Sequence, residues 1–234
     1  MFSFEESQAL RLTLLVSVAA VGLGLPLAVG IGWWLARVRF PAKFLVETII
    51  NFPLVLPPVV TGYLLLVLFG RRGWLGGLLE QWTGLRLVFD WKGAALAAAV
   101  VSFPLMVRPI RQAFQAVDVR LVQAARTLGA KPWDAFWSIS LPLAAPGILS
   151  GAVLAFARSM GEFGATIMIA GNIPGQTRTI PLMIYSHLET PGGEAEAYRL
   201  VVLSIVVSAA ALLAGSYLER RGQRLLQRAD HDTT

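Results

Sequence analysis

The segment QAARTLGAKPWDAFWSISLP, residues 123–142, lies between two long apolar stretches and has the pattern of two short helices joined by a corner. Gly129 can take the left-handed conformation that ends a helix, and Pro132 suits the first turn of the next. Small and leucine side chains share one face of the first helix: Leu121, Ala125 and Leu128. The second helix has an aromatic surface, made by Trp133, Phe136 and Trp137. An ordered surface of this kind outside the apolar stretches indicates a partner.

The rest of the chain is strongly apolar. Of its 234 residues 56% are hydrophobic and 15% charged, which is too apolar for an ordinary soluble domain. A helix needs roughly 20 mostly apolar residues to cross a bilayer. Windows of that kind cover residues 10–36, 45–69, 93–110, 143–170 and 197–218. The sequence therefore predicts one all-α integral membrane domain, residues 1–234, with about five transmembrane helices and a loop at residues 111–142.

Basic residues indicate how this domain is oriented. They gather after the first window, around and after the third, and in the tail, and such residues favour the cytoplasmic side. The N-terminus is therefore expected outside, and the C-terminus and the loop at residues 111–142 inside. Arg71 and Arg72 then lie on the outer side and are an exception to the rule. The net charge of +6 is explained by this asymmetry, without a nucleic-acid partner.

Several function classes are excluded by missing motifs. The chain has no cysteine, so it has no disulfide, thiolate metal site or cysteine nucleophile. Its sequence has no zinc-binding helix motif, no Gly-x-Ser-x-Gly elbow and no phosphate-binding loop. We therefore expect no enzyme, no metal site and no cofactor in this chain, and any energy from ATP must come through a partner. The opening residues, 1–6, lack the basic start of a secretion signal, so the first apolar segment is expected to remain in the mature protein.

The segment at 123–142 resembles the cytoplasmic signature of importer permeases of the ATP-binding-cassette class, in which Glu-Ala-Ala is followed at fixed spacing by Gly, Ile and Leu-Pro. Only the first position departs, with Gln123 in place of Glu. The resemblance implies the type I importer permease fold, with a coupling helix that fits a groove on an ATP-hydrolysing subunit. The residues assigned to coupling are Gln123, Ala124, Ala125, Gly129, Ala130, Trp133, Ile139, Leu141 and Pro142. An amphipathic hairpin lying on the membrane surface is the alternative.

Three further stretches, residues 51–63, 155–166 and 172–181, are similar to the molybdate permeases of that class. This resemblance implies a bacterial cytoplasmic-membrane protein in contact with lipid, paired with a second copy of itself. It also implies two subunits that bind ATP and Mg, and a periplasmic protein that delivers the oxyanion. Sulfate and tungstate permeases share much of the pattern, so molybdate is the expected cargo with those ions as alternatives. A secondary carrier, which uses no ATPase, is the rival of a different class, but we detect no internal repeat.

Prolines interrupt the second apolar window at Pro53, Pro57 and Pro58. A kinked helix frees backbone carbonyls, which a membrane protein tolerates where protein or a water-filled cavity satisfies them. The kink therefore predicts a translocation pathway or, alternatively, a device for helix packing. Polar side chains near it could contact a passing oxyanion or bond to other helices: Asn51, Thr61 and Tyr63.

Arg158 and Glu162 stand four residues apart in the fourth window and can pair on one helical face. Charged groups at membrane depth are costly, so they are functional candidates, either as a structural or gating ion pair or as a substrate ligand. Ser159 and Gly164 beside them complete the candidate pathway or gate. Glycines along this window permit close packing within the subunit or with a second copy: Gly147, Gly151, Gly161 and Gly164. The following segment, residues 171–196, holds an apolar run too short to cross, which predicts a gate or binding-protein contact, or an ordinary outer loop.

Overall fold

The computed structural model describes residues 3–231, with side chains described as far as residue 217. Residues 3–231 contain helices and no strand, which confirms the predicted all-α class. Among the described residues four helical stretches are long and apolar enough to cross a membrane, and the bent pair α2 and α3 is a fifth if it is counted as one span. The elements are α1 (Phe4–Arg37), α2 (Lys43–Val55), α3 (Pro58–Phe69), α4 (Trp74–Thr83), α5 (Trp91–Ala116), α6 (Val119–Thr127), α7 (Pro132–Ala135), a π-helical turn (Phe136–Ser140), α8 (Leu141–Met160), α9 (Gly164–Ala170), α10 (Ile180–Leu188) and α11 (Glu194–His231).

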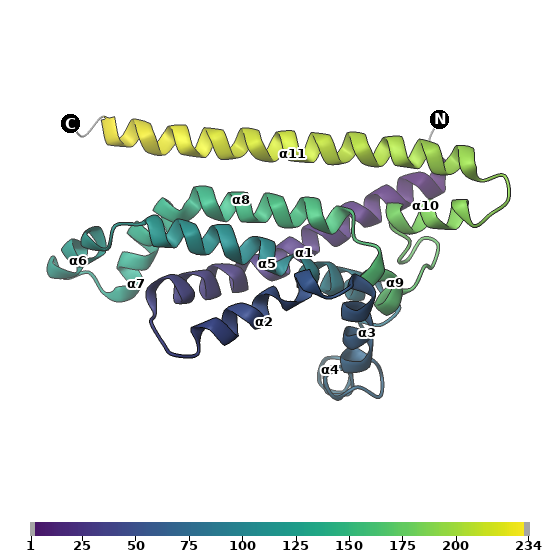
Figure 1. The fold of residues 1–234 in the computed structure, drawn as a ribbon, viewed down its shortest axis with the longest axis horizontal. Coiled ribbons are helices and arrows are strands. Elements are labelled where there is room, and N and C mark those ends of the chain that lie inside the picture. The colour runs from purple at the N-terminus through teal and green to yellow at the C-terminus, as the bar shows by residue number, and fades with distance from the viewer. Residues whose placement is uncertain (1–2, 232–234) are drawn as a thin grey trace.

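The long helices lie roughly side by side, as Figure 1 shows. The last turns of α11 lie at the end that carries α6 and α7, and the start of α1 lies toward the end that carries α9 and α10. Helix α3 runs across the direction of the long helices, and α4 extends from it to one side. The two ends of the bundle therefore have different structures: a compact helical corner at one, and short helices with loops at the other.

Small side chains make α5 the centre of the bundle. Its first half buries a run of alanines that lets neighbouring helices approach: Ala94, Ala95, Ala97, Ala98 and Ala99. On α1, Gly24 and Gly32 face Met106 and Ile110 of α5 so closely that a Cβ atom would lie 2.5 and 2.8 Å from them. Close approach of this kind replaces the hydrophobic effect as the force between helices in lipid. Helix α11 lies outside this core, packed on α8 and α10, with most of its described side chains exposed.

Two predicted apolar windows are not single helices. The window at 45–69 consists of α2 and α3, which meet at 111°. Pro57 holds Leu56 in an extended conformation with ψ 141°, because a residue before proline avoids the helical region. The window at 143–170 also divides: α8 ends at Met160, and α9 begins at Gly164. The sequence predicted a kink in the first window and missed the break in the second.

The predicted loop at residues 111–142 is mostly helical. Helix α5 continues to Ala116, α6 follows, and α7 runs through the π-helical turn directly into α8. The two short helices predicted for this segment are present, but the second is the first turn of a long membrane helix. A displacement of α7 is therefore transmitted to α8 through continuous helical backbone.

Candidate functional site

The corner between α6 and α7 is fixed by its own backbone. Asp118 caps α6 by accepting a hydrogen bond from the backbone N–H of Arg120, at 2.9 Å. At the other end Gly129 takes φ +95°, as the sequence predicted, and its N–H donates to the carbonyl of Arg126 at 3.1 Å. The N–H of Ala130 reaches back to the carbonyl of Ala125 at 3.0 Å, which closes the helix in the manner of a glycine C-cap.

Phe136 anchors this corner to the membrane helices. Its ring packs against Trp33 of α1 and Phe114 of α5, with centroids 5.5 and 6.1 Å away. Trp133 and Trp137 then pack on Phe136 from outside, at 5.6 and 5.5 Å. Arg37 adds a polar tie by donating to the carbonyl of Val117 at 3.1 Å. Of the three aromatic residues predicted for a partner surface, Phe136 is thus half-buried against α1 and α5, and Trp133 and Trp137 are exposed.

The outer side of the corner is an unusually apolar surface. Leu128 is 89% exposed, Trp133 69% and Trp137 61%. We call these three residues, with the exposed Gln123, Ala124 and Gly129, the α6–α7 surface. The other residues predicted for coupling are placed differently: Ala125, Ala130, Ile139 and Leu141 are half-buried beneath it, and Pro142 is exposed at the start of α8. Large apolar groups held rigidly in the open are typical of a binding surface.

A second candidate site lies where α3 meets α9. The backbones are so close there that a Cβ on Gly62 would lie 2.5 Å from the carbonyl oxygen of Ala165, and one on Gly164 would lie 3.0 Å from Cβ of Pro58. Thr61 is buried beside this contact, and its hydroxyl has no hydrogen-bond partner among the described residues. Tyr63 is 53% exposed on the same helix, and Pro57 is exposed at the bend before it. Five of the predicted pathway residues therefore surround one junction, while Pro53 lies earlier in α2.

The predicted pair of Arg158 with Glu162 is confirmed, with Nη1 of Arg158 2.8 Å from Oε2 of Glu162. The other oxygen of Glu162 accepts from the backbone N–H of Ala165 at 2.8 Å, so this carboxylate also caps the start of α9. Its side chain is only 2% exposed, whereas that of Arg158 is 32% exposed. Ser159, next in line, bonds to Ser102 of α5 at 3.3 Å. Both carboxylate oxygens of Glu162 thus have a partner within the protein, and of the two side chains only that of Arg158 is partly exposed.

A polar cavity of about 230 Å³ between α2 and α5 was not predicted from the sequence. Arg111 pairs with Glu47 across it at 2.9 Å, and Arg108 donates from Nε to the side-chain carbonyl of Asn51 at 2.8 Å. Asn51 in turn donates to the carbonyl of Glu47 at 2.6 Å. Of the two roles proposed for Asn51, bonding between helices is the one observed. The signal in the sequence was the spacing of Arg108 and Arg111, three apart at the polar end of an apolar window.

The glycines of the fourth window pack within the subunit. Added Cβ atoms on Gly147 and Gly151 would meet α5, and one on Gly164 would meet α3. Gly161 has open space around it, at the break between α8 and α9. Close packing against the chain's own helices therefore accounts for three of the four predicted positions.

The segment at 171–196 is folded by its own polar hydrogen bonds and joined to α1 by one more. Asn172 donates to Ser186 at 2.7 Å and accepts from Arg178 at 2.9 Å. The backbone N–H of Ile180 donates to Thr13 of α1 at 2.9 Å. The apolar run predicted not to cross forms α10, which packs on α1 and α11. Its part in gating or receptor contact stays a prediction.

Comparisons with known proteins agree with this architecture. Residues 28–224 match the family model described as "binding-protein-dependent transport system inner membrane component". The molybdenum transport system permease protein ModB of Escherichia coli (strain K12) is 55% identical over 92% of this chain and 94% of its own length. That of Haemophilus influenzae is 51% identical over 94% of this chain and 96% of its own. The sulfate transport permease CysW of Synechococcus elongatus is 38% identical over 89% of this chain and 69% of its own.

Solved structures with the same fold are importer permeases. A bacterial ABC transporter that imports alginate superposes with a TM-score of 0.74 at 18% identity, covering 94% of this chain and 80% of that one. The MetNI methionine ABC transporter gives a TM-score of 0.65 at 18% identity, with 93% and 94% covered. At this identity the similarity defines the fold alone.

Proposed function

The chain belongs to the family of inner-membrane components of binding-protein-dependent transport systems, and on that premise we propose that it imports molybdate, driven by ATP hydrolysis on a partner subunit. The observation that carries the cargo is the 55% identity to a molybdenum permease across nearly the whole chain. Sulfate permeases are more distant, at 38% identity, and are the second choice. The transported species is thus a tetrahedral dianion, and tungstate is expected to compete with molybdate.

The proposed docking site for the ATP-hydrolysing subunit is the α6–α7 surface. Burying exposed apolar surface is worth about 25 cal/mol per Å², so Leu128, Trp133 and Trp137 offer a partner the main source of affinity here. Arg120, Arg126 and Lys131 are exposed around them and suit an acidic rim on that partner. Because α7 continues into α8, a push on this surface moves the helix that carries Arg158.

In the proposed assembly two copies of the chain enclose the pathway, each above one ATPase subunit, and a periplasmic binding protein delivers the anion. The α6–α7 end is then cytoplasmic and the N-terminus outside, in keeping with the positions of the basic residues. The tail arginines that support this orientation lie among residues whose side chains the structure does not describe.

The proposed pathway runs past the α3–α9 junction and the polar cavity between α2 and α5. Arg158, Arg108 and Arg111 provide positive potential along it, and each has a polar partner that weakens its hold on a dianion. Weak binding suits a transporter, because an anion bound tightly at membrane depth leaves slowly. Switching between the inward-open and outward-open forms is expected at the breaks in the helices, since these have the fewest backbone bonds to lose.

The test is uptake of labelled molybdate into proteoliposomes that contain this chain, its ATPase and its binding protein. Leu128→Asp places a charge in the proposed interface and leaves the fold intact, because Leu128 is 89% exposed. We expect it to reduce ATP-dependent uptake at least about tenfold and to release the ATPase during purification. For retention of the ATPase during purification Leu188→Asp is the matched control, since Leu188 is 62% exposed on α10 at the other end. Its uptake is not compared, because segment 171–196 is itself a predicted contact of the binding protein.

Three outcomes of this experiment would contradict parts of the proposal. Equal release of the ATPase from Leu128→Asp and Leu188→Asp, or full retention in both, would place coupling elsewhere. Uptake that persists without the ATPase would make the chain a secondary carrier. A preference for sulfate over molybdate would keep the ATP-driven machine and change its cargo.

A further inference from the structure

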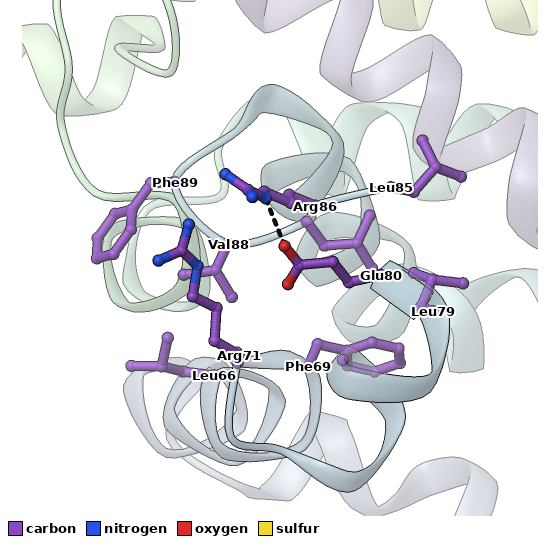
Figure 2. Close-up of a pocket in the computed structure, with 12 residues that line it drawn as sticks. Leu66, Phe69, Arg71, Leu79, Glu80, Leu85, Arg86, Val88 and Phe89 are labelled. Carbon is purple, nitrogen blue, oxygen red and sulfur yellow. Dashed lines mark hydrogen bonds and ion pairs between the residues drawn. The ribbon is translucent and has the colours of Figure 1, made fainter. Parts of the chain in front are cut away.

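The two arginines that break the charge rule, Arg71 and Arg72, have different surroundings. Arg71 lines a pocket of about 440 Å³ between the end of α3, α4 and the segment at residues 84–90, and Arg72 does not. Figure 2 shows the guanidinium groups of Arg71 and Arg86 facing the same space. The walls around them are apolar, formed by Leu66, Phe69, Leu79 and Leu85. The pocket thus combines cations with a hydrocarbon lining.

The pocket has an excess of positive charge. Nε of Arg86 lies 2.8 Å from Oε1 of Glu80, so that arginine is neutralised. Arg71 makes no salt bridge within the described part of the chain. Two guanidinium groups beside one carboxylate leave room for one further negative charge. Guanidinium groups bind phosphate oxygens with paired hydrogen bonds, which makes a phosphate ester the best-matched anion.

The walls of this pocket are preformed. A Cβ atom added to Gly73 or Gly76 would lie only 2.3 Å from a backbone carbonyl oxygen of α3. The corner between α3 and α4 therefore has no room for a side chain at either position. On the opposite wall Phe89 has φ +56°, a strained conformation for a residue with a side chain. It is held there by a hydrogen bond from its N–H to the carbonyl of Ile169, at 3.0 Å. This bond also connects the pocket to the last turn of α9.

Helix α4 places the pocket at the edge of the bilayer. With ten residues it is too short to cross. One face carries Trp74, Leu78 and Trp82 at intervals of four residues, and they are 77%, 43% and 84% exposed. Tryptophan is enriched at the level of lipid headgroups, and a short amphipathic helix with such a face lies along the interface. A pocket behind this helix is at the depth of lipid phosphates.

We propose that this pocket binds one anionic phospholipid, with its phosphate between Arg71 and Arg86 and an acyl chain along the leucine-rich wall. The apolar wall distinguishes the lipid from free phosphate, which shares the charged part of the chemistry. The tryptophan face favours lipid over an acidic segment of the binding protein, because that face is itself expected in the membrane. The proposal gives Arg71 a reason to stand on the outer side, and it holds whichever ion the protein transports.

The experiment measures lipid retained by the purified chain, by native mass spectrometry after titration with phosphatidylglycerol or phosphatidylcholine. We expect wild type to retain phosphatidylglycerol in preference, and Arg71→Gln to weaken that retention about tenfold through loss of a charge-assisted contact. Arg72→Gln is the matched control and should behave as wild type. Glu80→Gln removes the negative charge and should strengthen retention, a gain that a merely unstable variant cannot give.

Four results would overturn the proposal. They are equal retention of the two lipids, an unchanged affinity in Arg71→Gln, an equal loss in Arg72→Gln, and displacement of the lipid by sodium phosphate or by the purified binding protein. Transport is not part of the readout. A failure of the proposed molybdate uptake would therefore leave this test valid, and the reverse also holds.

Discussion

The break between α2 and α3 and the break between α8 and α9 interrupt two apolar segments, but different groups cause them. At the first, Pro57 forces Leu56 out of the helical region, and Pro58 begins the next helix. At the second there is no proline: α8 ends at Met160 with Gly161 as its C-cap, and the carboxylate of Glu162 accepts a hydrogen bond from the free N–H of Ala165. The break between α2 and α3 is therefore caused by the prolines of the backbone itself, whereas the break between α8 and α9 depends on a buried charged side chain.

The two breaks meet in space, which is why the difference matters. Gly62 of α3 touches the backbone of Ala165 in α9, and Gly164 touches Pro58. A break set by proline is permanent, whereas a break set by a carboxylate can open when that carboxylate loses its partners. We infer that α3 is the fixed side of the junction and α9 the side able to move.

Removal of the carboxylate is expected to have the largest effect. Glu162→Ala loses both the contact with Arg158 and the cap on α9, and it leaves an arginine unpaired at membrane depth. Breaking a buried pair costs about 3–5 kcal/mol. Because the Arg158 side chain is 32% exposed and so partly solvated, we expect a lower loss, about 2–3 kcal/mol in the free energy of unfolding. Denaturant titration in mixed micelles measures it.

Glu162→Gln separates the two contributions. Its side-chain oxygen can still accept from Ala165, but its charge is gone, so about half of the loss should return. If Gln were as damaging as Ala, the ion pair alone would hold the break. If Ala cost less than about 0.5 kcal/mol, the carboxylate would not be its cause.

The contrast also marks how far the sequence could predict this fold. The bend at Pro57 and Pro58, the corner at Gly129 and the pairing of Arg158 with Glu162 each follow from a few neighbouring residues, and each was predicted. The end of α8 at Met160 was missed, because residues 143–170 form one continuous apolar window and nothing local stops the helix. The start of α9 after the break is capped by a hydrogen bond from Ala165 to the buried carboxylate of Glu162. The value of that bond depends on burial, and burial is a property of the folded bundle.

The candidate sites follow the same division. The α6–α7 surface was predicted because its residues are contiguous and regularly spaced. The network of Glu47, Arg108 and Arg111 was not, since its members come from two helices brought together only by folding. The pocket beside Arg71 likewise joins three segments, and the sequence showed only an arginine on the unexpected side.

A methyl group placed between α3 and α9 should have the next largest effect on the free energy of unfolding. In Gly62→Ala the new Cβ would lie 2.5 Å from the carbonyl oxygen of Ala165 and 2.7 Å from its Cα, and backbone atoms cannot turn aside. We expect a loss of about 1–3 kcal/mol, measured by the same titration, because overpacking forces the two helices apart. Gly22→Ala is the matched control: it lies in α1 with nothing within 4 Å of the new atom, so it should be neutral or stabilise by up to about 1 kcal/mol. Equal behaviour of the two variants would mean that α3 and α9 are not in contact.

Replacing one of the two prolines between α2 and α3 should have the smallest effect on the free energy of unfolding. Pro58→Ala keeps the Cβ that faces Gly164, and alanine fits the first position of a helix, so we expect a change of no more than about 0.5 kcal/mol. Pro57 still keeps Leu56 extended, and the 111° bend should persist. The chain has no cysteine, so spin labels on cysteines introduced at Ile49 and Val67, which are 71% and 52% exposed, report the angle as a distance.

That distance should be the same in wild type and Pro58→Ala, and it should gain a longer component only when Pro57 is replaced as well. A longer component in the single variant would mean that Leu56 is not held by the proline after it. An unchanged distance in the double variant would mean that contact with α9 sets the bend. In that case both breaks would depend on the same junction, and α3 could no longer be regarded as its fixed side.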